Sequence, residues 1–402
     1  MAHVTAATAP SWFQDKILLG MSLRQYLRSL LTPLNGLAFA ICAVGLPLIV
    51  YRFAAGLGAT TNLSQTQPWG LWIGFDMMTG IALAAGGFTI GATVELFGLD
   101  EYHPIERPAI LTGFLGYVLA VLGLICDLGR PWNMVQVMVR NGTASVLFEV
   151  AWCVMCYTSV LALEFAVPFF EWLGWKKAHG ALKKALLALT VLSVMFSTMH
   201  QSALGSLYII APGKIHPLWY SPWIFVFFFI TAIIAGISMV IFEGAISHIT
   251  FHKLFQGHHV DFDKLSIGLA KAGALVTFAY FFLRLQGVAD AHAWGEIKGF
   301  YGAWWLVEML GFVLLPSLLY AYGARNRSVK AVRLAATLGV AGVVLNRLNI
   351  SLVAYNWNQA QRYLPSWMEI WVSLTLVTLG VLSFRWIVNR MPVLRPMAGS
   401  GH

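Results

Sequence analysis

Charged side chains are scarce in this sequence. Asp, Glu, Lys and Arg make up 11% of its 402 residues, and hydrophobic residues make up 58%. An average soluble domain is about 25% charged and about 45–50% apolar, so this chain has too few polar side chains to cover a water-exposed surface. We therefore predict an all-α integral membrane protein.

Cysteine is scarce too, and the motifs of common cofactors are missing. The four cysteines, Cys42, Cys126, Cys153 and Cys156, fall within or at the ends of apolar runs, without the grouping of an iron–sulfur site. Cys153 and Cys156 form a C-x-x-C, which we interpret as packing rather than redox chemistry, since free cysteine behaves as a small hydrophobe. No glycine-rich nucleotide loop is present. We expect no bound metal.

Paired histidines at matching membrane depth are also missing. A transmembrane b-type haem usually takes its axial histidines from facing helices at similar depth. Of the 11 histidines, only His200 falls well inside a predicted span. His248 and His252 are one turn apart at a helix end, where we favour solvated loop residues over a surface site. We therefore expect no haem.

A secretory signal is missing from the start of the chain. Residues 1–35 lack a basic start, a compact apolar run and a small-residue cleavage site. We interpret them as a cytoplasmic or interfacial segment, in which the amphipathic residues 12–31 lie along the inner membrane surface.

The net charge of +9 comes from short basic clusters between apolar runs. Such clusters are typical of topology signals rather than of a phosphate-binding stripe, so we expect no nucleic-acid partner. Of the 26 Lys and Arg residues, 17 fall on one side of the predicted spans and 7 on the other. The positive-inside rule then places both termini in the cytoplasm.

Apolar runs of about 20 residues predict the membrane-spanning helices. We expect ten, at residues 36–55, 70–97, 107–127, 144–170, 183–210, 222–247, 266–287, 302–322, 333–354 and 367–388. They form a single transmembrane domain over residues 36–390, followed by a cytoplasmic tail at 391–402. Residues 129–141 are expected to be an outer loop.

The second and sixth spans share a plan of outer aromatic residues, central small residues and an inner acid. Ala84–Gly87 and Ala235–Ser238 hold the small residues, which let helices pack closely in lipid. This favours two four-helix bundles with flanking helices, built from repeats at 70–210 and 222–354. Repeats of this kind often place a site within or between the bundles.

Ionisable residues inside a span each cost at least a few kcal/mol, so they are rare and usually paired or functional. From helix position, an outer group holds Asp76, Asp127, Glu149, Arg284, Glu308 and Arg347, while Glu95, Glu164 and Glu243 lie toward the inner end. His200 and Gln201 lie near mid-depth. The alternative is that these are structural ion pairs, for example Glu308 with Arg347.

The outer group suits a redox-active quinone, which needs hydrogen bonds at two carbonyl oxygens, a slot for its tail and a supply of protons. His200, Asp76 and Asp127 are our candidates for proton donation, with Arg130 and Gln201 as further donors. We expect a proton pathway from among Glu149, Glu164, Glu243, Glu308 and Arg347.

Six motifs in one order carry a family resemblance: Pro68–Asp76, Tyr102–Pro108, Cys126–Asn133, Ser145–Glu149, Thr198–Ser202 and Lys214–Trp219. They resemble the NrfD/polysulfide-reductase membrane subunits, and most of all the HybB-type "cytochrome b" subunits of respiratory nickel–iron hydrogenases. The likeness is strong over spans two to six and looser through residues 347–356.

The resemblance implies a haem-free anchor in the bacterial inner membrane that reacts with menaquinone or ubiquinone. Its partners would be a periplasmic iron–sulfur electron-transfer subunit and the large and small hydrogenase subunits, which hold the catalytic centre. The site residues that it carries over are Asp76, Asp127, Arg130, His200 and Gln201, with Trp69, Trp72, Glu149 and Tyr208 beside them.

Three alternatives remain. The partner could serve another donor, such as polysulfide or nitrite, because family membership fixes the fold better than the substrate. The chain could instead be a proton or solute transporter, which intramembrane acids and repeats also suit. It could also be a passive anchor whose polar residues only pack.

Overall fold

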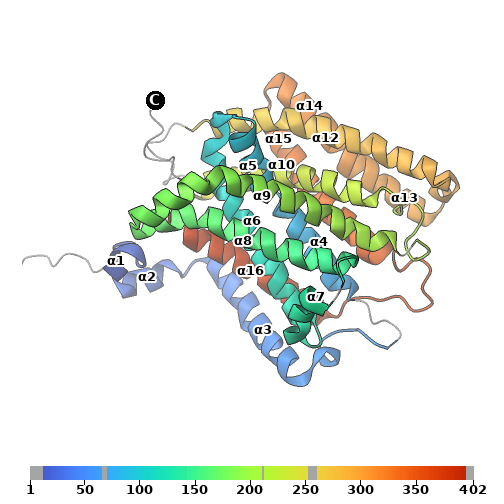
Figure 1. Ribbon diagram of the computed structural model, residues 1–402, viewed down its shortest axis with the longest axis horizontal. Helices are drawn as coiled ribbons and strands as arrows, with labels where there is room; N and C mark the ends of the chain where they lie inside the picture. Colours follow the sequence, from blue (N-terminus) through green and yellow to red (C-terminus); the bar gives the residue numbers. More distant parts are fainter. Residues whose placement is uncertain (1–11, 66–69, 141, 211, 252–259, 395–402) are drawn as a thin grey trace, which may run out of the picture.

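The computed structural model describes residues 12–65, 70–140, 142–210, 212–251 and 260–394. This part of the chain contains ten helical segments that are long and apolar enough to cross a membrane, and no strand. The prediction of an all-α membrane protein is thus confirmed. Figure 1 shows the long helices side by side, with α1 and α2 at one end of the molecule.

Five of the spans are single helices and five are composite or extended. The single helices are α3 (Pro33–Ala55), α8 (Val146–Leu173), α10 (Ile224–Thr250), α12 (Phe262–Asp290) and α16 (Trp367–Val388). The second span joins α4 (Leu71–Leu83), α5 (Gly86–Gly91) and a π-helical turn, η2 (Ala92–Leu96). The third joins η3 (Asp100–Tyr102) and α6 (His103–Asp127).

The eighth span joins α13 (Phe300–Leu306), π-helical η6 (Val307–Leu314) and α14 (Leu315–Asn326), and the ninth joins α15 (Val329–Leu348) and π-helical η7 (Asn349–Val353). The fifth, α9 (Lys176–Ile209), begins seven residues before its predicted start. The seven residues before that start include Lys176 and Lys177, so an apolarity criterion excludes them although the helix has already begun.

Two groups of four spans pack against each other along α5 and α10. The first group holds α4–α5, α6, α8 and α9, and the second holds α10, α12, α14 and α15. A Cβ on Gly236 would lie 2.9 Å from the Ala85 carbonyl oxygen, and one on Gly86 would lie 2.9 Å from Val240 Cγ2. Small residues therefore permit this contact, as we expected. That the two groups are repeats stays a prediction.

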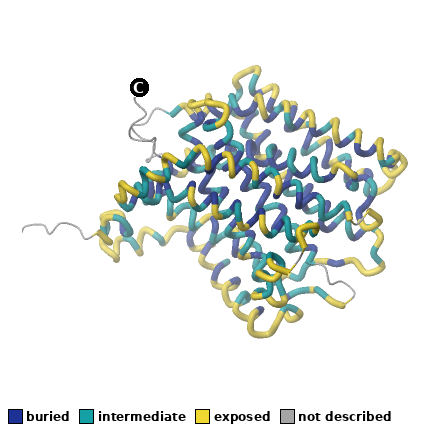
Figure 2. The backbone as a smooth tube through the Cα atoms, in the orientation of Figure 1, coloured by how far each residue is buried: buried dark blue, intermediate teal, exposed yellow. Residues whose placement is uncertain are grey.

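The first and last spans lie at the side of the first group. α3 packs on α16, and α16 packs on α6. Figure 2 shows α3 exposed over much of its length, as expected of a helix that faces lipid.

The two ends of the described chain meet on one side. The Arg390 guanidinium donates hydrogen bonds to the Ile17 carbonyl at 2.8 Å and to the Tyr26 hydroxyl at 2.8 Å. The N-terminal segment forms two short helices, α1 (Trp12–Lys16) and α2 (Leu23–Ser29), because Leu19 and Gly20 between them have positive φ. Which side of the membrane these ends occupy stays a prediction.

One expected loop contains a helix. Residues 129–141 hold α7 (Met134–Arg140), whose Val135 and Val139 are exposed while Met134 and Val137 face a pocket. α7 carries apolar residues on both faces, but its apolar run is too short to span a membrane. The sequence therefore indicated a loop.

Candidate functional site

Asp76 and Asp127 line one small pocket of about 30 Å³ between α3, α4, α6 and α16. The same pocket is lined by Arg52 from α3 and Glu369 from α16, which the sequence did not single out. We call it the acidic pocket. Three carboxyl groups and one guanidinium in a confined space can exchange protons and orient a polar ligand.

Hydrogen bonds fix the acids of this pocket. Trp72 Nε1 donates to Ser373 Oγ at 2.8 Å, and Ser373 Oγ donates to Asp76. Glu369 accepts from the Tyr363 hydroxyl and from the Ser366 backbone N–H, the latter at 2.7 Å. Burial, together with its bond to Glu369, raises the pKa of the Tyr363 phenol, so this group remains a donor.

His200 lies deeper, in the core of the first helix group. His200 and Gln201 are 0% exposed, and Gln201 Nε2 donates to the Ile81 carbonyl at 3.1 Å. Tyr117 of α6 contacts His200, with ring centroids 5.7 Å apart, and Tyr157 of α8, with centroids 4.6 Å apart. Ile81 is five residues below Asp76, so the two levels differ by about 7.5 Å along the helix.

This core group, which we call the His200 cluster, consists of Tyr117, Tyr157, Ser197, His200 and Gln201. Both ring nitrogens of His200 have no hydrogen-bond partner in the described chain, and the two tyrosine hydroxyls, the Ser197 hydroxyl and Gln201 Oε1 gather around them without a hydrogen bond of good geometry. An unsatisfied buried polar group costs about 1–3 kcal/mol. So many together are typical of a site that binds a polar ligand or conducts protons.

A large apolar pocket of about 620 Å³ lies beside this cluster, toward the predicted outer end of the helices, between α4, α6, α7 and α8. Val121 and Val154 line it, and they stand one turn outward of Tyr117 and Tyr157 on the same helices. Arg130, which is exposed, lies at its edge. The structure thus separates Arg130 from Asp76 and Asp127, whose pocket holds Arg52 instead.

On the inner side, polar groups continue beneath the His200 cluster. Ser193 and Ser197 lie beside the Tyr157 phenol, and Ser193 Oγ donates to Glu164 Oε2 at 3.5 Å. Glu164 is 4% exposed. These residues form a column from the cluster toward the inner end of the helices.

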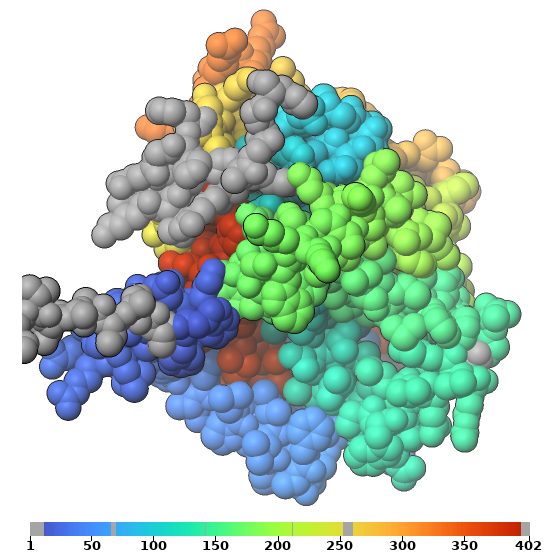
Figure 3. All heavy atoms as spheres, turned by 60° about the vertical axis from the view of Figure 1, so that its left-hand side comes forward, coloured from blue at the N-terminus to red at the C-terminus, as the bar shows by residue number. Residues whose placement is uncertain are grey.

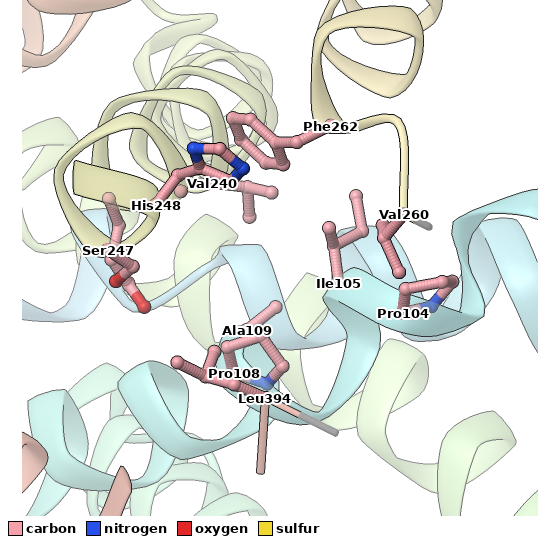
Figure 4. Close-up of a pocket in the computed structure, with 12 residues that line it drawn as sticks. Pro104, Ile105, Pro108, Ala109, Val240, Ser247, His248, Val260, Phe262 and Leu394 are labelled. Atoms are coloured by element: carbon pink, nitrogen blue, oxygen red, sulfur yellow. The ribbon is translucent and has the colours of Figure 1, made fainter. Parts of the chain in front are cut away.

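Glu243 lies apart from this column. It accepts a hydrogen bond from Thr112 Oγ1 and lines a small inner pocket of about 40 Å³ between α6, α10 and the start of α12. Figure 4 shows Pro104, Pro108 and Phe262 around this pocket, which is mostly apolar.

Glu308 is held in a cage of hydrogen bonds in the second helix group. Its carboxylate accepts from Trp219 Nε1 at 2.8 Å, from Asn346 Nδ2 at 2.7 Å and from Asn349 Nδ2. Arg347 donates to Asn346 Oδ1 at 2.9 Å, so Asn346 stands between the two charges. The direct Glu308–Arg347 pair that we considered is therefore wrong.

The remaining candidates lie in different places. Tyr208 packs on Phe228, with ring centroids 6.0 Å apart, beside the second helix group. Glu149 lies in the first turn of α8, next to the pocket residue Val150. Trp69 lies outside the described residues.

His216, in the outer loop after α9, is buried against Trp219, Tyr301 and Trp357. Its Nδ1 accepts from the Leu218 backbone N–H at 3.2 Å. Burial lowers the pKa of the His216 imidazole, and Glu296 at 3.9 Å opposes this effect.

Haem ligation can be tested on the same geometry. In the described spans, His200 is the one histidine near mid-depth, while His103, His179 and His248 lie at helix ends. A pair of axial histidines on facing helices is thus not formed by the described residues.

In the described residues, ten apolar helices bury titratable side chains among them, which defines a multi-pass membrane protein with ionisable groups in its helical core. The chain belongs to the NrfD, polysulphide reductase, family, whose model matches residues 45–357. The family comprises inner-membrane subunits of quinone-linked oxidoreductases. The match ends before α16, which supplies Glu369 and Ser373 to the acidic pocket.

Curated relatives extend over nearly the whole chain. A protein of Nitratidesulfovibrio vulgaris, whose name states no activity, is 47% identical and covers 91% of this chain and 96% of its own length. The probable Ni/Fe-hydrogenase 2 b-type cytochrome subunit of Escherichia coli is 33% identical over 88% of this chain and 91% of its own length. The menaquinone reductase integral membrane subunit of Nitratidesulfovibrio vulgaris is 26% identical, over 85% and 87%.

Sequence reasoning missed several polar residues that the fold brings to these sites. Arg52, near the end of the first predicted span, is 5% exposed, and Glu369 lies at the start of the tenth span; the sequence singled out neither. Tyr117 and Tyr157 carried a signal, since a phenol in mid-span needs a polar partner.

Proposed function

We propose that this chain is the quinone-reactive membrane subunit of a respiratory nickel–iron hydrogenase. It takes electrons from a periplasmic iron–sulfur subunit and passes them to menaquinone or ubiquinone in the outer half of the membrane. The names of the hydrogenase 2 and menaquinone reductase relatives support this assignment. The corresponding orientation places both termini in the cytoplasm.

The observation that carries the proposal is the pairing of the His200 cluster with the large apolar pocket on its outer side. The cluster offers His200, whose two ring nitrogens have no hydrogen-bond partner in the described chain. The pocket, at about 620 Å³ and lined mostly by apolar side chains, suits a ring and the start of an isoprenoid tail. His200 then donates a hydrogen bond to one quinone carbonyl.

The acidic pocket supports this chemistry from the other face of α4. Asp76, oriented by Ser373, and Asp127 hold protons at the outer level. Arg52 and Arg130 supply positive charge on opposite sides of α6, where they stabilise negative charge that develops on the substrate. Trp72, Gln201 and Tyr208 remain proposed quinone contacts.

Protons come from the cytoplasmic side in this proposal. Glu164, Ser193 and the Tyr157 phenol form the route to His200, and Glu243 collects protons at the inner pocket. Because electrons enter from the outer side and protons from the inner side, turnover is electrogenic. We assign Glu308 and Arg347 to the same pathway through the cage, and Glu149 to its outer end.

The test of the quinone site uses the complete hydrogenase complex with His200→Ala. Hydrogen-dependent reduction of a quinone should fall by about tenfold or more, since one hydrogen bond to a charged transition state is worth about 1.5–3 kcal/mol. Hydrogen-dependent reduction of a soluble viologen, which needs only the catalytic subunits, should stay at the wild-type rate. Full quinone reduction in an assembled His200→Ala complex removes His200 from the site.

The proton route is tested in proteoliposomes with Glu164→Gln and Glu243→Gln. Each variant should lower the number of protons moved per hydrogen oxidised more than it lowers the rate of quinone reduction. Unchanged proton translocation in both variants contradicts the route.

The alternatives make different predictions. A transporter moves protons or solute as the purified chain alone, without a redox partner. A passive anchor binds no quinone-site inhibitor. Mass spectrometry of the co-purifying subunits distinguishes a hydrogenase from a polysulfide- or nitrite-linked complex, and an absorption spectrum without a Soret band supports a haem-free chain.

A further inference from the structure

A second polar site lies at the inner end of the turn between the second and third spans. Glu95 belongs to the π-helical turn η2, and His103 and Glu106 belong to the first turns of α6. The connection between them turns sharply through Gly98, at φ 66°. π-helical turns are rare and frequently lie at functional sites. His103 and Glu106 come from the Tyr102–Pro108 motif, to which the proposed function gives no role.

The three side chains converge. One ligand atom from each of Glu95, His103 and Glu106 lies within 4.8 Å of the other two. His103 Nδ1 is 2.7 Å from Glu106 Oε2. Glu106 is 2% exposed, and its other oxygen, Oε1, is buried without a hydrogen-bond partner. A buried carboxylate oxygen in this state carries a strong preference for a cation.

The neighbouring cations are engaged elsewhere. Arg107, the next residue along α6, pairs with Glu171 at 2.8 Å and donates to the Pro392 carbonyl at 2.6 Å. Lys264 lies 3.2 Å from Glu101. Two carboxylates with one imidazole therefore keep at least one negative charge, even if His103 is protonated.

The separations suit a metal ion after a small adjustment. Ligand atoms at about 2.0–2.2 Å from a tetrahedral Zn²⁺ lie roughly 3.3–3.6 Å from one another. The three groups lie within 4.8 Å of one another, so they need only a small rearrangement in which the His103–Glu106 hydrogen bond opens. Glu95 and His103 are partly exposed, which leaves their side chains free to move. Figure 3 shows that this turn, coloured cyan, reaches the surface at the end of the molecule that carries α1 and α2, so an ion can enter from the aqueous side.

We propose that Glu95, His103 and Glu106 bind one divalent first-row transition-metal ion, with water completing its coordination. One imidazole and two carboxylates select Zn²⁺, Mn²⁺ or Fe²⁺ over Mg²⁺ and Ca²⁺, which prefer oxygen ligands alone. The ion clamps η2 to the start of α6 and so fixes the second and third spans at their inner ends. The sequence did not predict this site, because its ligands are separated by eight and three residues across a turn.

Zinc binding to the purified complex tests the proposal directly. The protein carries an affinity tag without histidine, and bound zinc is measured by equilibrium dialysis and mass spectrometry. We expect one saturable Zn²⁺ per chain, a higher melting temperature with Zn²⁺, and no displacement by excess Mg²⁺. Glu106→Gln, His103→Gln and Glu95→Gln should each weaken binding about tenfold or more.

Glu101→Gln is the matched control. Glu101 is an acid in the same turn, outside the cluster, so its variant should bind zinc as the wild type does. Glu95→Gln keeps the proposal testable if the Glu106 variant does not fold, because Glu95 is only partly buried. Three results overturn the site: wild-type zinc affinity in the folded Glu95→Gln and His103→Gln variants, an equal loss of zinc affinity in Glu101→Gln, or displacement of bound zinc by Mg²⁺. None of these measurements depends on electron transfer, so the result is independent of the proposed function.

Discussion

The Glu308 cage separates a bracing role from a proton-carrying one, because the two roles respond differently to Glu308→Gln. The carboxylate accepts from three donors, on Trp219, Asn346 and Asn349. A glutamine keeps one acceptor oxygen, which can serve Trp219 and Asn349, and turns its amide N–H groups toward Asn346. Asn346 cannot flip to accept, since its Oδ1 already accepts from Arg347 at 2.9 Å.

Glu308→Gln therefore leaves one buried donor without a partner, which costs about 1–3 kcal/mol. Glu308→Ala strands all three donors and adds a cavity, at about 3–5 kcal/mol. We expect melting temperatures in the order wild type, Glu308→Gln, Glu308→Ala, measured by tryptophan fluorescence of the purified complex. Glu149→Gln, at a partly exposed acid with no hydrogen bond that we describe, is the control and should melt with the wild type.

The same variants decide whether Glu308 also carries protons. If Glu308 only braces the structure, Glu308→Gln loses quinone reduction only as the protein unfolds. Its activity measured well below the melting temperature then stays near the wild-type value. Lost proton translocation in Glu308→Gln, measured well below its melting temperature, supports the proton-pathway role proposed above. Wild-type translocation removes Glu308 from that pathway and leaves it the bracing role alone, while a wild-type melting temperature contradicts the bracing role.

Three further predictions follow from single contacts. Gly236→Leu should lower the melting temperature by an amount equivalent to about 1–3 kcal/mol, because its Cβ meets the backbone at the start of α5. Gly36→Leu is the control, since the space around its Cβ is open. Equal melting temperatures of the two variants contradict the close packing. Ser373→Ala removes the donor to Asp76 and should lower kcat/KM for quinone roughly 5–30-fold. Viologen reduction should not change. A wild-type kcat/KM for quinone shows that Asp76 does not need Ser373 to orient it. The pKa of buried His216 is lowered in the folded state, so the unfolded chain binds more protons at acidic pH. Stability should therefore decline as pH falls below about 6.5, by at most about 1.4 kcal/mol per pH unit. His216→Gln should flatten this decline, and an unchanged slope contradicts the prediction.

The spans were predictable because a helix in lipid must satisfy its own backbone and present apolar side chains along about 20 residues. All ten were located, and errors arose where helices left the membrane, as at Lys176, or broke locally, as at Leu19 and Gly20. Family membership was also readable from motif order, since several motifs along one chain are far more specific than any one of them.

The grouping of the polar residues was less predictable. Asp76 and Asp127 share a pocket as expected, but their cationic neighbour is Arg52 from the first span rather than Arg130. Helix position gives depth to within a turn, yet it does not say which helix faces which. Arg52 and Arg130 are both at outer helix ends, and only the packing of α3 and α16 on α6 distinguishes them.

By itself, the sequence determined the membrane class, the ten spans and the family, because hydropathy and short-range motifs are local properties of the chain. Tertiary structure alone decided that Asn346 separates Glu308 from Arg347, that Tyr117 and Tyr157 surround His200, and that Glu95 meets His103 and Glu106. Those contacts depend on the rotation of each helix about its axis and on which helices are neighbours. Both are set by packing between residues far apart in the chain.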